Sequence, residues 1–160
     1  MPIITDANVL IDYLEGDIST LSLYSEHIEK VIIPSVILDE VDGLSIDDCE
    51  TYGFEVVFEE LDLLFEASNS QHGPLSFQDK VCLYMAKEDK SITCITNEKA
   101  LRKFCEKDGI PVKRGLKLIV ELVQLKKLTK QVAISTVERI HRSNPLHINR
   151  EVVEAFKSML

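Results

Sequence analysis

Short apolar runs that alternate with helical segments constrain the fold of this chain most. Five runs of three to five residues, rich in isoleucine and valine, are expected to form strands, at about 2–5, 31–33, 54–57, 92–95 and 110–113. Nearly continuous apolar strands are typical of a parallel sheet that is buried on both faces. The sequence therefore predicts an α/β fold, a three-layer α/β/α sandwich with a mostly parallel central sheet of four to five strands.

Segments with helical spacing of apolar residues fill the intervals between these strands. The spacing predicts helices at about 6–15, 19–29, 35–42, 46–52, 59–67, 76–87, 97–107, 116–125, 130–143 and 149–160. A chain of 160 residues without repeats or a clear linker is expected to be a single domain, 1–160. The last two helices, about 130–160, could instead form a docking or dimerisation appendage.

The charges are unevenly distributed along the chain. Residues 1–79 hold 18 acidic residues and one basic residue, whereas residues 80–160 hold 9 acidic and 17 basic residues, which gives the net charge of −9. A strongly negative total argues against a simple nucleic-acid-coating protein. An acidic part that holds metal and a basic part that holds phosphates would suit a nuclease. A solvated surface with a chance asymmetry remains the alternative.

The cysteines and the termini indicate a cytoplasmic protein. Cys49, Cys82, Cys94 and Cys105 form no CxxC motif and have no histidine at ligand spacing, so we expect reduced thiols in the core. The first residues lack the basic region and cleavage site of a signal peptide. No apolar stretch is long enough to cross a bilayer, so no membrane association is expected.

Four acidic residues are the candidates for chemistry. Asp6 and Glu98 follow predicted strands, Glu40 lies in the first turns of the helix after another strand, and Asp79 lies in the first turn of a helix. The carboxyl ends of parallel strands share one edge of the sheet, where ligands bind in such folds. Clustered carboxylates need a cation to remain ionised, and hard oxygen ligands suit Mg²⁺ or Mn²⁺. This pattern favours metal-assisted hydrolysis, most simply of a phosphodiester.

Each acid also has a structural interpretation. Asp6 could cap a helix, Asp79 has capping-box spacing from Ser76, and Glu98 could interact with a helix dipole. Glu40 lies on an apolar stripe, where a partly desolvated carboxylate needs a partner, and no lysine or arginine is nearby in the sequence. The ordered set of four favours the metal site more than any one residue does.

Several neighbouring residues are candidates for supporting roles. Asn8 could orient a ligand or a water, and Thr96 could cap a helix or hydrogen-bond a carboxylate. Two basic clusters could guide an RNA backbone, or could be solvated helix ends: Lys113, Arg114 and Lys117, and further along Lys126, Lys127 and Lys130. The four histidines show no paired spacing and receive no role.

Four ordered segments resemble the PIN-domain ribonucleases, in particular toxins of the virulence-associated protein C type. They are IITDANVLIDYL (3–14), VIIPSVILDEV (31–41), LSFQDKVCLYMA (75–86) and ITCITNEKALRKFCEKDGIPV (92–112). The resemblance covers nearly the whole chain in order and spacing. It places the acidic positions of the family on Asp6, Glu40, Asp79 and Glu98.

The resemblance implies a Mg²⁺- or Mn²⁺-dependent endoribonuclease that cleaves single-stranded RNA. Asp6, Glu40 and Asp79 would hold the metal, and Glu98 would complete the site or orient the water. It also implies an antitoxin protein as a partner, and a homodimer. Two departures stand out, because Glu98 replaces the usual Asp and Ala7 replaces a frequent Ser or Thr.

Two other functions remain open at this point. A PIN-like domain that has lost activity could serve as a binding module for RNA or protein, and the departure at Glu98 favours that alternative. A receiver-type phosphoacceptor domain also clusters acids at strand ends. However, it needs paired acids after the first strand and an acceptor Asp after the middle strand, and this chain has neither.

Overall fold

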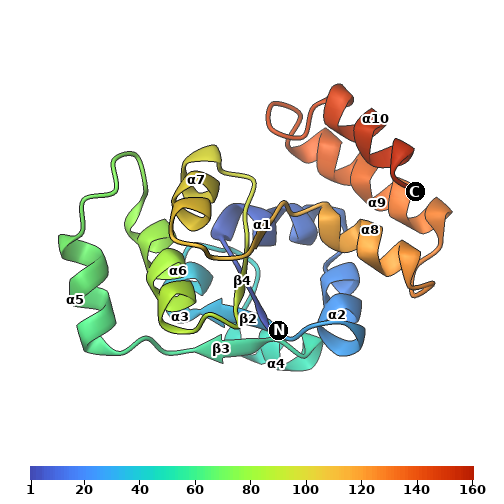
Figure 1. The fold of residues 1–160 in the computed structure, drawn as a ribbon. Coiled ribbons are helices and arrows are strands. Elements are labelled where there is room, and N and C mark those ends of the chain that lie inside the picture. The colour runs from blue at the N-terminus through green and yellow to red at the C-terminus, as the bar shows by residue number, and fades with distance from the viewer.

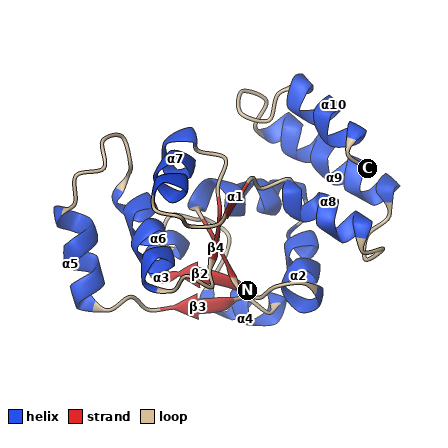
Figure 2. Ribbon diagram, in the orientation of Figure 1, coloured by secondary structure: helices blue, strands red, loops and turns tan.

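The computed structural model describes residues 1–160 and contains a five-stranded sheet in the order β3-β2-β1-β4-β5. Its strands are Ile3–Thr5 (β1), Val31–Pro34 (β2), Glu55–Val57 (β3), Thr93–Ile95 (β4) and Val112–Lys113 (β5). Every neighbouring pair is parallel, and the central residue Ile4 lies opposite Ile32 on one side and Cys94 on the other. The carboxyl ends of all five strands therefore meet at one edge of the sheet (Figure 2).

Helices cover both faces of this sheet (Figure 1). They are α1 (Ala7–Gly16), α2 (Ile18–His27), α3 (Ser35–Leu38), α4 (Ile46–Tyr52), α5 (Leu61–Asn69), α6 (Phe77–Glu88), α7 (Lys99–Lys107), α8 (Lys117–Gln124), α9 (Lys130–Ser143) and α10 (Arg150–Ser158). One layer contains α6 and α7, with α5 packed outside α6, and the opposite layer contains α2 and α4. The predicted α/β/α sandwich is confirmed, and the sheet is entirely parallel.

One predicted helix is much shorter than expected. The helix expected at 35–42 ends at Leu38, and a turn follows in which Glu40 donates its backbone N–H to Ile37 and Val41 donates to Leu38. This turn brings the side chains of Val41 and Leu44 into the core, where they are 4% and 6% exposed. Burial of these two apolar side chains favours the turn over a longer helix.

Polar residues at the carboxyl edge of the sheet begin the helices there. Asp6 caps α1 by accepting the N–H of Val9 at 2.8 Å, and Ser76 caps α6 by accepting the N–H of Asp79 at 3.1 Å. Such caps satisfy backbone donors that have no partner within the helix. They also direct the positive ends of these helix dipoles towards the same edge of the sheet.

The C-terminal helices pack on the rest of the chain. A single cluster of 37 buried apolar residues includes Ile140 of α9 and Val153 and Phe156 of α10. Helix α9 crosses α1 at Gly16, whose carbonyl accepts a hydrogen bond from Arg139 at 2.7 Å. Figure 1 shows α9 and α10 side by side, with α1 and α8 between them and the sheet. That they form a docking or dimerisation appendage stays a prediction.

All four cysteine thiols are free and buried, as the sequence predicted. None of the ten helices combines the length and the apolar character that a membrane-spanning segment requires.

Candidate active site

Asp6 is the most constrained of the predicted acids. Its side chain is 1% exposed; one carboxylate oxygen accepts the N–H of Val9 and the other accepts the hydroxyl of Thr96. Burial raises the pKa of Asp6 to about 7, and the nearby charges of Asp79 and Glu98 add to this effect, while the two hydrogen bonds oppose it. The ionised form of Asp6 therefore lacks a compensating positive charge within the protein.

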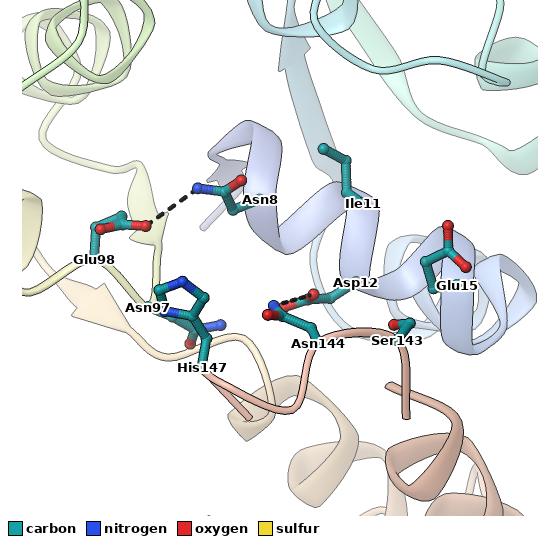
Figure 3. Close-up of a pocket in the computed structure, with 9 residues that line it drawn as sticks. All are labelled: Asn8, Ile11, Asp12, Glu15, Asn97, Glu98, Ser143, Asn144 and His147. Atoms are coloured by element: carbon teal, nitrogen blue, oxygen red, sulfur yellow. Dashed lines mark hydrogen bonds between the residues drawn. The ribbon is translucent and has the colours of Figure 1, made fainter. Parts of the chain in front are cut away.

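Thr96 links Asp6 to Glu98. Its buried hydroxyl donates to Asp6 and accepts the N–H of Glu98 at 3.0 Å, so it holds the carboxyl end of β4 against that of β1. Glu98 precedes α7 but makes no capping bond with its side chain. Instead, its carboxylate accepts the side-chain amide of Asn8 at 3.1 Å (Figure 3). Asn8 and Thr96 thus both contact the predicted acids, and the interaction of Glu98 with the dipole of α7 stays a prediction.

Asp79 lies near enough to Asp6 and Glu98 for the charges of the three residues to interact. Because α6 runs antiparallel to the strands, its first turn is at the carboxyl edge of the sheet. Burial raises the pKa of Asp79, and the charges of Glu98 and Glu40 raise it further, against the lowering effect of hydrogen bonds with Ser76. Asp79 is thus both a capped helical residue and a member of the acidic group.

Glu40 differs from its prediction. It is exposed and lies in the turn after α3, whereas the sequence placed it in a helix on a partly desolvated apolar stripe. The cause is the early end of α3, which turns Val41 inwards and Glu40 outwards. Glu40 still lies near enough to Asp79 for its charge to affect the pKa of that residue.

The donor atoms fit a hard divalent cation in chemical type. The candidate ligands are carboxylates, and Asp6 is buried with a pKa of about 7, so its charge is not fully compensated by its neighbours. However, no three His, Cys, Asp or Glu side chains are close enough in this structure to form a ligand set as they stand. The four acids are neighbours that repel one another, as the raised pKa values of Asp6 and Asp79 indicate.

The three predicted RNA-contacting cations are not equivalent. Lys113 forms an ion pair with Glu121 at 2.6 Å, so its charge is already engaged. Arg114 and Lys117 are exposed and form no ion pair. Together with Lys113 they border a groove of about 470 Å³ between β5, α8 and α10.

The sequence interpretation missed a stripe of lysines on α7. Lys99, Lys103 and Lys107 recur every four residues, are exposed and form no ion pair. They line a groove of about 470 Å³ with Pro74 and Phe104. The stripe begins one residue after Glu98 and therefore leads away from the acidic group. The four-residue spacing was a visible signal for it.

Another acid at the sheet edge was also missed. Glu59 follows β3 by two residues and accepts hydrogen bonds from the Ser35 hydroxyl at 2.6 Å and the Val36 N–H at 3.0 Å. Both oxygens are thus used to begin α3. Glu59 is not among the charges that raise the pKa of Asp6 or of Asp79, which separates it from the acidic group. Its position after a strand was the signal, as it was for Asp6.

Comparison with known proteins identifies the class of fold. Residues 2–160 match the family described as DUF3368, a PIN domain, so the chain belongs to the PIN domain family. Among solved structures, it is similar to a PilT N-terminus domain protein from the hyperthermophilic archaeon Sulfolobus solfataricus P2. That match has 15% sequence identity and a TM-score of 0.53, and it covers 76% of this chain and 92% of the other. No curated protein matches the sequence significantly.

Family membership gives the coarse function. PIN domains are usually nucleases, which are hydrolases, and PIN nucleases typically use Mg²⁺ or Mn²⁺. The acidic group lies at the carboxyl edge of a parallel sheet, where such folds bind their ligands.

Proposed function

We propose that this protein is a metal-dependent endoribonuclease that cleaves phosphodiesters of single-stranded RNA. Asp6, Glu40, Asp79 and Glu98 would hold Mg²⁺ or Mn²⁺ and form the catalytic site. A bound cation of this kind lowers the pKa of a coordinated water and neutralises charge on the phosphate.

The observation that carries the proposal is the placement of Asp6. A carboxylate that is 1% exposed, with two acidic neighbours that raise its pKa, is costly to ionise in the metal-free protein. Strongly perturbed acids in such a group are typical of functional sites. Thr96 and Val9 hold Asp6 in one orientation, and Asn8 holds Glu98, so the acids are positioned before a substrate arrives.

The substrate class follows from the surface beside the acids. A phosphodiester backbone needs cations near an otherwise acidic site, and Arg114, Lys117 and the α7 lysines are exposed there. Single-stranded RNA is the substrate that the virulence-associated protein C resemblance implies.

The test is cleavage of a labelled single-stranded RNA mixture by the purified protein with Mn²⁺ or Mg²⁺. We expect cutting that EDTA abolishes and that Asp6→Asn reduces by at least about a hundredfold, as for loss of a group acting in the transition state. Asp39→Asn, an exposed acid on the same turn as Glu40, is the matched control and should cleave normally. Cleavage that persists in EDTA or in Asp6→Asn would contradict the proposal.

A catalytically weak or inactive binding module is the second candidate. The feature that favours it is the identity of Glu98, which replaces the Asp usual at this position in the family that the sequence resembles. Glu98→Asp separates the two candidates. An inactive wild type that gains cleavage on this change would support the second candidate, and an active wild type that gains nothing would support the first.

The most specific part of the proposal is a toxin role, with an antitoxin partner and a homodimeric assembly. It is supported by the resemblance of the four sequence segments. An apolar patch on and before α5, where Phe58, Leu61 and Phe65 are 68%, 66% and 59% exposed, provides a surface for association. Induced expression should arrest growth for the wild type and not for Asp6→Asn; equal growth of the two would reject the toxin role.

A further inference from the structure

A polar cavity adjoins the acidic group and is used by nothing described so far. It has a volume of about 440 Å³ and lies between α1, the turn after β4, and the turn that joins α9 to α10 (Figure 3). Its lining includes Asn8 and Glu98 from the acidic site, and Ile11 is its only apolar residue. The far wall is formed by Asn144 and His147, so the C-terminal helices complete the cavity.

The side chains of the cavity are held in place by hydrogen bonds. Asn144 donates its amide to one oxygen of Asp12 at 3.0 Å, across 132 positions of the chain. Asp12 is 6% exposed, and its other oxygen has no hydrogen bond. Asn97 accepts the N–H of Gly115 at 3.0 Å, which fixes its carboxamide at the cavity. The polar groups are therefore preorganised and partly unsatisfied.

The acidic residues that line the cavity disfavour an anionic ligand and favour one with hydrogen-bond donors. Asp12, Glu15 and Glu98 all border the cavity and repel a phosphate. Carboxylates accept hydrogen bonds from N–H groups. Because Asn8 donates its Nδ2 to Glu98, its Oδ1 is left as a further acceptor. Because Asn97 accepts the Gly115 N–H at its Oδ1, its Nδ2 is left as a donor. A flat group with adjacent amino and ring N–H donors matches this lining, and guanine presents that pair on its Watson–Crick edge.

We propose that this cavity binds a nucleobase of the RNA next to the cleaved phosphate and selects guanine, with Asp12 as the main acceptor. This inference rests on the proposed function for its substrate and adds the base that the site prefers. Buried acceptors discriminate strongly, because a base without the matching donors leaves them unpaired. Single-stranded RNA can supply such a base because its bases can be splayed out of the stack.

The neighbouring groove gives the strand a continuous path. Asn97 and His147 line both the cavity and the groove bordered by Arg114 and Lys117. Glu98 lines the cavity and belongs to the acidic group. The cavity thus lies between the acids, where a phosphate is cut, and the cations, which suit the next phosphate of the strand.

The test measures nucleotide binding by the metal-free wild-type protein, followed by ¹⁵N NMR with EDTA present. The probes are GMP, AMP, CMP and UMP, which share a phosphate and differ in the base. We expect GMP to bind at least about fivefold more tightly than UMP and to shift the side-chain amides of Asn8, Asn97 and Asn144. Equal affinities for the four nucleotides, or shifts confined to Arg114 and Lys117, would overturn the inference.

Variants separate the cavity from the general surface. Asp12→Asn replaces an acceptor by a mixed donor and acceptor, and His147→Ala removes an exposed wall residue. Each should weaken GMP binding by about fivefold, which removes the preference for GMP, and should leave UMP binding unchanged. His27→Ala on α2 is the matched control and should change neither affinity. A thermal melt confirms folding, and His147→Ala keeps the test decisive if Asp12→Asn is unstable.

A metal ion is the competing occupant of the cavity, and MgCl₂ alone in EDTA-free buffer tests for it. Shifts of the cavity amides with Mg²⁺ and none with GMP would reject the base site.

Cleavage mapping keeps this inference distinct from the nuclease proposal. If the wild type cleaves next to guanine and Asp12→Asn cleaves without that preference, both stand. Selective binding of GMP without any cleavage supports the cavity and contradicts the nuclease. Cleavage with the same base preference in Asp12→Asn supports the nuclease and overturns the cavity assignment.

Discussion

At the scale of single residues, Asp6 carries opposing demands. It caps α1 and accepts the Thr96 hydroxyl, and both interactions favour its ionised form. Burial and the neighbouring acids favour the protonated form, and their effect is larger, since the pKa rises to about 7. A buried carboxylate with a raised pKa lowers the stability of the metal-free protein, and a bound cation would compensate its charge.

We predict that Asp6→Asn stabilises the metal-free protein in a pH-dependent way. The folded-state pKa of Asp6, about 7, exceeds the ordinary value of 3.8, so its ionisation destabilises the folded protein increasingly from pH 4 to pH 7. Asn carries no charge and is also a good N-cap. Its gain should be absent at pH 4 and should reach up to about 4 kcal/mol above pH 7.

Urea unfolding in EDTA between pH 4 and pH 8 measures this gain. Asp47→Asn on the exposed first turn of α4 is the control, which should show no such trend. A gain at pH 8 no greater than that at pH 4 would show that Asp6 is not desolvated as described.

Thr96 leads to a second prediction about Asp6. Its hydroxyl lowers the pKa of Asp6 by donating to the carboxylate, so Thr96→Val, which preserves shape, should raise that pKa further above 7. The ¹³C chemical shift of the Asp6 carboxyl reports the titration directly and needs no enzymatic activity. Thr51→Val, whose hydroxyl bonds only the carbonyl of Asp47, is the control. A lowered or unchanged pKa in Thr96→Val would show that the hydroxyl does not stabilise the carboxylate.

The sequence revealed some of these residues because their signals are local. Asp6 and Glu98 follow apolar strands closely, and that is visible without a structure. The exposure of Glu40 was not predictable from periodicity, because it depends on the turn that buries Val41 and Leu44. The bond between Asp12 and Asn144 joins residues 132 positions apart, and no local pattern indicates it.

At the scale of elements, the strands were predictable from local sequence, whereas the packing of the helices on one another was not. All five strands were predicted to within about two residues. The signal is clearest for β1, β2 and β4, which are buried throughout and almost wholly apolar. The packing of α9 across α1 was not predicted, because it depends on the absence of a side chain. At Gly16, an added Cβ would lie 2.6 Å from the Cγ1 of Ile140, which is fully buried.

We therefore predict that Gly16→Ala destabilises the protein by about 1–3 kcal/mol, the usual cost of overpacking. Helix propensity alone predicts the opposite sign, with a gain of up to about 1 kcal/mol. Urea unfolding decides between them. In the double variant with Ile140→Ala, the added methyl has room, so Gly16→Ala should cost less there than in the wild type. Equal costs in both backgrounds would place the strain elsewhere.

At the scale of the whole molecule, the uneven charge along the chain becomes an arrangement in space. The acidic part supplies β1 to β3 and three of the four site acids, whereas the basic part supplies α7 to α10. Glu98 lies at the meeting of the two, directly before the lysine stripe of α7. A chain of net charge −9 can therefore bind a polyanion only along restricted surfaces.

These surfaces can be distinguished by the salt dependence of RNA binding. Each lysine that neutralises a phosphate of a single strand contributes about −0.7 to the slope of log K against log[salt]. Replacing Lys99, Lys103 and Lys107 together by Ala should therefore make the slope shallower by about 2, and affinity should fall for all sequences alike. Fluorescence anisotropy of a labelled single-stranded RNA in EDTA measures both quantities without cleavage.

The matched control is the triple Ala variant at Lys126, Lys127 and Lys130. It removes the same charge from the turn after α8 and the first residue of α9, far from α7 in Figure 1. Its slope should equal that of the wild type, because charge lost away from the strand releases no counterions. If this control changes the slope and the α7 variant does not, the RNA follows α8 and α9 and passes away from the acids. The α7 stripe would then be a solvated helix face. RNA bound along α7 would release fewer counterions once its lysines were removed, and the slope would have to change.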